Sequence, residues 1–215
     1  VATTTVRTIY LATPGVNPDT VGDPSHYTGN WIPRLGSTTA STPVVIEGLP
    51  GLSSAPVLDG NGGTTAAPCQ TTSCASAIFT ITSKGYLTLQ GFTMAHGSNT
   101  VGGDGGAIDN ADNSLGVTAA GTVAVTTSTF SANAATRVGG AIDNADNWGT
   151  GTVVLRAATV AANTAGITGP GIASTVGDAR SSGTVTVAAD QLADACDRGI
   201  GTTTWTDAGY DVGDA

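Results

Sequence analysis

The stretch GGAIDNADN at Gly105–Asn113 occurs a second time, unchanged, at Gly139–Asn147, 34 residues further along the chain. A weaker copy, GPGIAS at Gly169–Ser174, begins 30 residues after the second one. A motif that returns with a period of about 20 to 50 residues indicates a solenoid or another repeat architecture, in which each repeat contributes one structural unit. The repeat therefore decides the fold class before any single element is assigned.

Four other segments share a second pattern of similar period. Their first glycines are 36, 30 and 32 residues apart, and each segment has apolar residues at its third, fifth and tenth positions. Apolar residues at alternate positions indicate strands with one inward face. The segments are GYLTLQGFTMAHG (85–97), GTVAVTTSTFSAN (121–133), GTVVLRAATVAAN (151–163) and GTVTVAADQLADA (183–195). Ile108, Ile142 and Ile172 supply a further inward position.

A unit of three short strands cannot bury its apolar face alone, whereas stacked units bury it in one continuous core. We therefore predict an all-β parallel solenoid with three short strands per coil of about 30 residues, one in GTVxV, one around TFxxN and one in GGAI. An antiparallel β-sandwich would also have short alternating strands. It would not explain related sequence every 30 to 36 residues.

The first 60 residues are the least repetitive part of the chain. They hold a long loop between Pro14 and Pro43 with His26, Tyr27 and Trp31. We expect residues 1–60 to form an N-terminal capping region and residues 61–215 to form the coils, all within one domain.

The motif GGAI with FxxN upstream of it (Phe130–Asn133, then Gly139–Ile142) resembles the repeats of polymorphic outer-membrane proteins and related bacterial adhesin-like proteins. The closing stretch CDRGIGTTTWTDAGYDVGD (Cys196–Asp214) resembles the coil end of secreted bacterial members of that group. The likeness covers about residues 76–214. It implies a right-handed, pectate-lyase-like parallel β-helix that is secreted or displayed on a cell surface, and it implies no particular activity.

Charge excludes some partners. The formal net charge is −9, with seven Lys and Arg dispersed along the chain. A nucleic-acid partner is not expected, because phosphate backbones require clustered basic residues. No apolar run approaches the roughly 20 residues of a spanning helix, so no membrane span is predicted.

The three cysteines give information on the redox state of the compartment in which the protein works. Cys69 and Cys74 flank a short polar loop, and we favour a local disulfide between them over two reduced thiols. A disulfide would indicate an oxidising, extracellular compartment. Cys196 is left over, either free or paired elsewhere.

The repeated aspartates can be interpreted in three ways. Stacking would bring Asp109 next to Asp143, and Asp112 next to Asp146, on neighbouring coils. Asp and Asn in turns cap backbone amides, which is the structural interpretation that we favour. Stacked carboxylates repel unless bridged, so a calcium ion is the second interpretation. The third is a carboxylate pair for sugar hydrolysis.

An enzyme is the main alternative to a binding protein. A polysaccharide lyase or glycoside hydrolase on this fold would need acidic and basic residues together, and the weak candidates are Asp109, Asp143 and Arg137. No set of Asp, Arg and Lys falls at matching positions in the coils. No other cofactor is expected.

Aromatic residues in loops are the best binding candidates. Trp148 directly follows the second repeat, and Tyr27 and Trp31 lie in the long loop. For Trp31 and for Trp205 we favour the structural interpretation, in which they cover the two open ends of the solenoid. We predict a structural or adhesin-type binding protein whose partner is a polysaccharide or a surface protein. End-to-end self-association into filaments is a further alternative, because open coil ends present strand edges. A column of outward threonines makes ice binding a minor possibility.

Overall fold

The computed structural model describes residues 7–11, 26–28, 43–60, 63–64, 67–68, 77–81, 84–99, 103–111, 119–145, 148–176, 179–209 and 212–213. These residues form strands, turns and bends, with no helix among them. Within these ranges nothing has the length and apolar character of a membrane-crossing helix.

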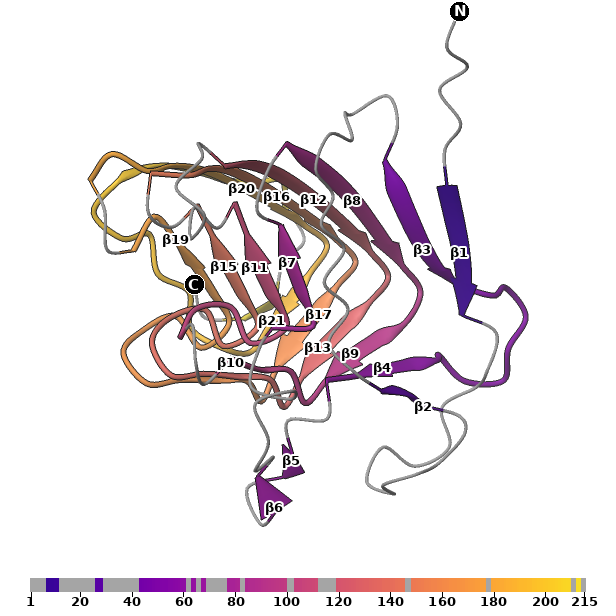
Figure 1. The fold of residues 1–215 in the computed structure, drawn as a ribbon. Helices are drawn as coiled ribbons and strands as arrows, with labels where there is room; N and C mark the ends of the chain where they lie inside the picture. Colours follow the sequence, from indigo (N-terminus) through magenta and orange to yellow (C-terminus); the bar gives the residue numbers. More distant parts are fainter. Residues whose placement is uncertain are drawn as a thin grey trace, which may run out of the picture.

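Two seven-stranded parallel sheets form the body of the molecule, with their strands stacked one behind another along a common axis (Figure 1). The long sheet contains, in order, β1 (Arg7–Leu11), β3 (Val44–Gly48), β8 (Gly85–Gln90), β12 (Ala120–Thr126), β16 (Thr150–Arg156), β20 (Ser182–Ala188) and β22 (Thr202–Asp207). The short-strand sheet contains β2 (His26–Thr28), β4 (Val57–Asp59), β9 (Thr93–Ala95), β13 (Thr129–Ser131), β17 (Thr159–Ala161), β21 (Gln191–Leu192) and β23 (Val212–Gly213).

Two smaller parallel sheets complete each coil. The GGAI sheet has the order β19 (Ile172–Ser174), β15 (Ile142–Asn144), β11 (Ile108–Asn110) and β7 (Phe79–Ile81). A three-stranded sheet contains β10 (Ser98–Asn99), β14 (Ala134–Ala135) and β18 (Thr164–Ala165). The short pair β5 (Gly63–Thr64) and β6 (Ala67–Pro68) is antiparallel.

The register confirms the parallel solenoid. Gly85, Gly121, Gly151 and Gly183 are partners across successive strands, so the coils are 36, 30 and 32 residues long. The β-sandwich alternative is wrong, because the strands of the large sheets pair in parallel with strands one coil away. The right-handed winding implied by the resemblance stays a prediction.

The core consists of inward columns that run up the axis. Each column is made by equivalent positions of successive coils, and its side chains are almost fully buried. The columns include Leu87–Val123–Val153–Val185, Leu89–Val125–Leu155–Val187, Met94–Phe130–Val160–Leu192 and Phe79–Ile108–Ile142–Ile172. These are the positions that the period-two pattern predicts to face inward.

The N-terminal segment contributes to the same sheets. β3 and β4 pair with β8 and β9, and β1 adds a further strand on β3. Residues 43–59 are therefore built in register with the coils that follow (Figure 1). Most of the expected long loop, 14–43, lies outside the described residues.

The two glycines of GGAI have different physical roles. Gly139 has a φ of 66°, a left-handed conformation that glycine adopts at no steric cost. Gly140 has no such φ, but a Cβ there would overlap the carbonyl oxygens of Pro170 and Thr164 in the next coil. The motif is thus a tight turn followed by a close approach between coils.

An asparagine ladder closes the corner between the GGAI sheet and the long sheet. Asn110 Nδ2 donates to Asn144 Oδ1 at 2.8 Å, and Asn144 Nδ2 donates to Ser174 Oγ at 3.1 Å. The same side chains lie against Gly121, Gly151 and Gly183, where any Cβ would overlap them. The ladder therefore explains the glycine that begins each GTV segment.

A second ladder explains FxxN. Asn133 Nδ2 donates to Asn163 Oδ1 at 2.9 Å, and Asn163 Nδ2 donates to Asp194 Oδ2 at 2.7 Å. Asn133 Oδ1 also accepts a bond from the backbone N–H of Gly97 at 2.8 Å. The buried asparagines thus satisfy backbone groups at a corner that the parallel strands leave unpaired.

Candidate binding site

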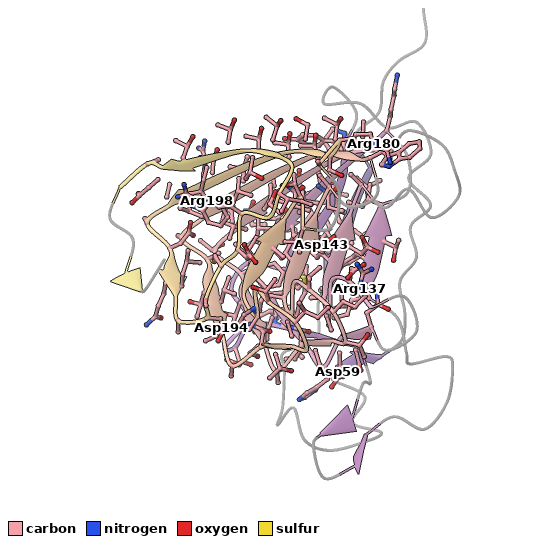
Figure 2. The ribbon with its side chains drawn as sticks, turned by 90° about the vertical axis from the view of Figure 1, so that its left-hand side faces the viewer. Asp59, Arg137, Asp143, Arg180, Asp194 and Arg198 are labelled. Carbon is pink, nitrogen blue, oxygen red and sulfur yellow. The ribbon has the colours of Figure 1, made fainter. Side chains whose placement is uncertain are left out.

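The repeated aspartates are stacked but are not presented to solvent. Asp109 and Asp143 are register partners in the GGAI sheet, where neighbouring strands are about 4.8 Å apart. Asp109 is 8% exposed and Asp143 is 0% exposed. Figure 2 shows Asp143 within the body of the solenoid, on the GGAI sheet. The next coil has Ala173 at this position, so the acidic column is two residues long there.

Within the described ranges, no three His, Cys, Asp or Glu side chains gather in a way that could hold a metal ion. Asp112 and Asp146, the other two proposed calcium ligands, lie outside those ranges. The calcium site therefore stays a prediction that needs a solution test.

The calcium hypothesis predicts that millimolar CaCl2 raises the Tm relative to EDTA. A ligand that binds only the folded chain stabilises it by mass action. Differential scanning fluorimetry with and without CaCl2 measures this shift, which should disappear in Asp143→Asn. An identical wild-type Tm in CaCl2 and EDTA would contradict the hypothesis.

Arg137, the basic residue of the catalytic alternative, is engaged at the GGAI turn. Its Nη1 lies 2.7 Å from Asp104 Oδ2, and the Asp104 side chain is 8% exposed. Its backbone oxygen accepts a bond from Ile167 N at 2.8 Å. This geometry ties successive coils together around Arg137.

One histidine is paired at a different corner. His96 Nδ1 lies 3.1 Å from Asp59 Oδ2, and both side chains are only slightly exposed. His96 has a φ of 55°, like Ala132 and Ala162 at the equivalent places in later coils. Because the same backbone conformation returns in each coil, His96 occupies a structural position at the corner of the coil.

Trp148 is presented very differently from the acidic residues. It is 51% exposed, and its backbone has a φ of 74°. Its N–H donates to Ser181 Oγ of the next coil at 3.0 Å. This backbone hydrogen bond fixes the main chain at the point where the indole ring leaves the surface.

Arg180 completes this surface feature. Its Cζ lies 3.6 Å from the centroid of the Trp148 ring, which is a close cation–π contact. Figure 2 shows Arg180 on the outside of the solenoid, well separated from Asp59 and Asp194. We call this pair the Trp148–Arg180 stack. It belongs to the side where the segments between the GGAI sheet and the long sheet vary in length.

Arg180 was not among the residues singled out from the sequence, although a signal was present. Trp148 lies three residues before Gly151, and Arg180 lies three residues before Gly183. Gly151 and Gly183 are register partners, so equal offsets place the two side chains on neighbouring coils. An alignment extended upstream of the GTV segments would have paired them.

The other predicted binding residues and the predicted disulfide are not seen at the Trp148–Arg180 stack in the described part of the chain. Tyr27 lies in β2 of the short-strand sheet, paired with Leu58, and its side chain is outside the description. Trp31, Cys69 and Cys74 fall entirely outside the described ranges. Among the described residues Cys196 is a free thiol, and its burial raises its pKa.

A shallow open groove of about 410 Å³ lies at another corner, between the loop after β3 and the turn after β8. Glu47, Gln90 and Thr127 supply polar side chains there. Its lining contains no aromatic residue, so it lacks a flat apolar surface for a sugar ring.

Comparison of the chain with protein-family models, with curated proteins and with solved structures found no match.

Proposed function

We propose that this chain is a secreted or cell-surface binding protein that uses the Trp148–Arg180 stack to bind a glycan. The observation that carries the proposal is a half-exposed tryptophan fixed on a rigid solenoid. The folded chain leaves Trp148 half exposed, and an exposed aromatic side chain on a loop is a candidate surface for a ligand.

The chemistry of the stack fits a sugar. An indole face packs against the C–H groups of a pyranose ring, and a guanidinium presents several fixed N–H donors to hydroxyl or carboxylate oxygens. The contact of Arg180 with the ring restrains both side chains, which reduces the entropy lost on binding. The net charge of −9 repels strongly acidic glycans, and the one arginine of the stack suits neutral or weakly acidic ones.

The resemblance of the GGAI and FxxN repeats to adhesin-like proteins supports the same location and role. Surface adhesins act by binding rather than by turnover, and a rigid repeat scaffold presents loops from one side.

The enzyme alternative is weaker in this geometry. A glycoside hydrolase needs two carboxylates that reach the scissile bond. Asp143 is completely buried and Asp109 nearly so. We therefore place the proposed function at the stack rather than at the acidic column.

A charged residue in the last described strand of the long sheet disfavours self-association at that strand. Asp207 of β22 occupies the inward column that continues Leu155 and Val187. A carboxylate at the end of an apolar column makes a further strand costly to add, as inward charges do at protected sheet edges. Filament formation stays a prediction that sedimentation at several concentrations can test.

Replacing Trp148 by alanine is expected to weaken glycan binding at least tenfold, because one ring provides the main apolar contact. Isothermal titration with neutral and uronic-acid oligosaccharides measures this change. Ile167→Ala is the matched control, because Ile167 is a large apolar residue that is 68% exposed away from the stack. Unchanged affinity in Trp148→Ala, or an equal loss in Ile167→Ala, would contradict the proposal.

A further inference from the structure

A regular grid of threonines covers the C-terminal part of the long sheet. In β16 and β20 the outward residues alternate with buried Gly, Val and Leu. In β22 they alternate with Thr203 and Trp205, which face inward. β16 and β20 each have four outward positions, of which the fourth is Arg156 in β16 and Ala188 in β20. The first three of each strand, with the three of β22, give nine places, which we call the threonine grid. They are Thr150, Thr152, Val154, Ser182, Thr184, Thr186, Thr202, Thr204 and Thr206.

The rows and columns are fixed by the register. Thr150, Ser182 and Thr202 are successive partners, as are Thr152, Thr184 and Thr204, and then Val154, Thr186 and Thr206. Neighbouring strands lie about 4.8 Å apart, and alternate residues along a strand about 6.7 Å apart. The grid is therefore a two-dimensional lattice of about 10 by 13 Å.

The nine places carry no charge, although the chain has a net charge of −9, and Arg156 borders them as the next outward residue of β16. Every place has a small side chain, and seven of the nine are threonine. Threonine combines a hydroxyl that bonds water with a methyl that does not. A charged group would impose its own hydration shell, whereas this mixed surface holds water at lattice-spaced hydroxyls with little perturbation.

The grid is also stiff. Threonine and valine are restricted at χ1, so their hydroxyls and methyls keep fixed directions. The inward side of the same strands is fully packed, with Val153, Leu155 and Val185 at 0% exposure. Figure 1 shows β16 and β20 stacked closely parallel, without the strong twist common in open sheets.

We propose that the threonine grid binds ice. Its strand spacing is close to the short lattice repeat of hexagonal ice. Its rigid rows of hydroxyls can hold water molecules in ice-like positions before the protein meets the ice crystal. A soluble glycan or protein is a poorer occupant, because the grid has neither an aromatic ring nor a charge to recognise one. The function goes beyond glycan binding at Trp148 and rests on different residues.

Thr184, at the centre of the grid, is the residue to replace. Tyr86 occupies the same outward column in β8, so the sheet accepts a tyrosine at this position. Thr184→Tyr should raise the concentration needed to inhibit ice recrystallisation at least tenfold and abolish thermal hysteresis. Thr204→Tyr on the exposed strand β22 should act similarly, and its exposed position keeps folding unaffected.

Thr159→Tyr is the matched control, because Thr159 faces outward from the short-strand sheet. It should leave both ice activities unchanged, and unfolding curves should show all three variants folded. A wild-type protein without ice activity would overturn the proposal. So would an equal loss in Thr159→Tyr, or binding of the wild type to crystalline cellulose or chitin through the grid in place of ice.

Discussion

Replacing Gly140 by alanine is expected to destabilise the solenoid by about 3 kcal/mol or more. The new Cβ would lie 2.5 Å from the Thr164 carbonyl oxygen and even closer to that of Pro170. Both oxygens belong to backbone of the next coil, which is fixed by its own parallel pairing, and Gly140 N itself donates to Gly169 O at 3.1 Å. Relief requires the coils to move apart. Equilibrium unfolding in urea, followed by circular dichroism, measures the loss.

Gly91→Ala is the matched control for this prediction. Gly91 has a φ of 73°, and a Cβ there would meet nothing within 4 Å. Thr127, Ala157 and Ala189 occupy the equivalent corner of later coils with φ between 49° and 57°. The cost should therefore be only the left-handed backbone strain of about 1 kcal/mol. Equal destabilisation by the two substitutions would show that close approach between coils is not the reason for GGAI.

Replacing Asn144 by alanine is expected to cost about 2 to 4 kcal/mol, because it interrupts a buried polar ladder at its middle. Asn144 Oδ1 accepts from Asn110 Nδ2, while Asn144 Nδ2 donates to Ser174 Oγ and to Gly151 O at 3.3 Å. Asn110 and Ser174 are both completely buried, so water cannot replace the lost partner without rearrangement. Urea unfolding again gives the change in free energy.

Ser174→Ala tests the same ladder at its end. Ser174 is as buried as Asn144, but its side chain contributes one hydrogen bond to the ladder, so its removal should cost about 1 kcal/mol. A smaller loss in Asn144→Ala than in Ser174→Ala would contradict the view that the ladder holds this corner.

The sequence was sufficient to predict the coil and its inward face. The period-two pattern placed Val123, Phe130 and Ile142 in the core, and the longer period required parallel stacking. Both signals come from burial of apolar side chains, which is the strongest term in the fold. The stacking of Asn110 on Asn144 also followed from the spacing, because identical residues one coil apart must be neighbours.

Features that depend on one coil's contact with the next were harder to predict. The burial of Asp143 was not evident, because an alternating pattern places it on the face opposite Ile142 and does not show whether that face is covered. The Trp148–Arg180 contact joins residues 32 positions apart in segments without a repeat motif. Glycine at 140 and glycine at 139 look alike in the sequence, yet only one of them needs a positive φ.

The last strand of the threonine grid was missed for a related reason. TTTWTD in β22 lacks the GTV signature, so the sequence pattern that the coils share ends at β20. Its partners in β20 show that Trp205 continues the inward column of Val153 and Val185, which turns Thr202, Thr204 and Thr206 outward. The complete grid therefore required the register.

The most direct test of the proposed function is the emission of Trp148 itself. A variant with Trp31→Phe and Trp205→Phe leaves Trp148 as the single tryptophan of the chain. Titration with the oligosaccharides that bind in calorimetry should give a saturable change in its fluorescence, with the same Kd as calorimetry. Binding that leaves this emission unchanged would show that the glycan binds elsewhere and would contradict the account.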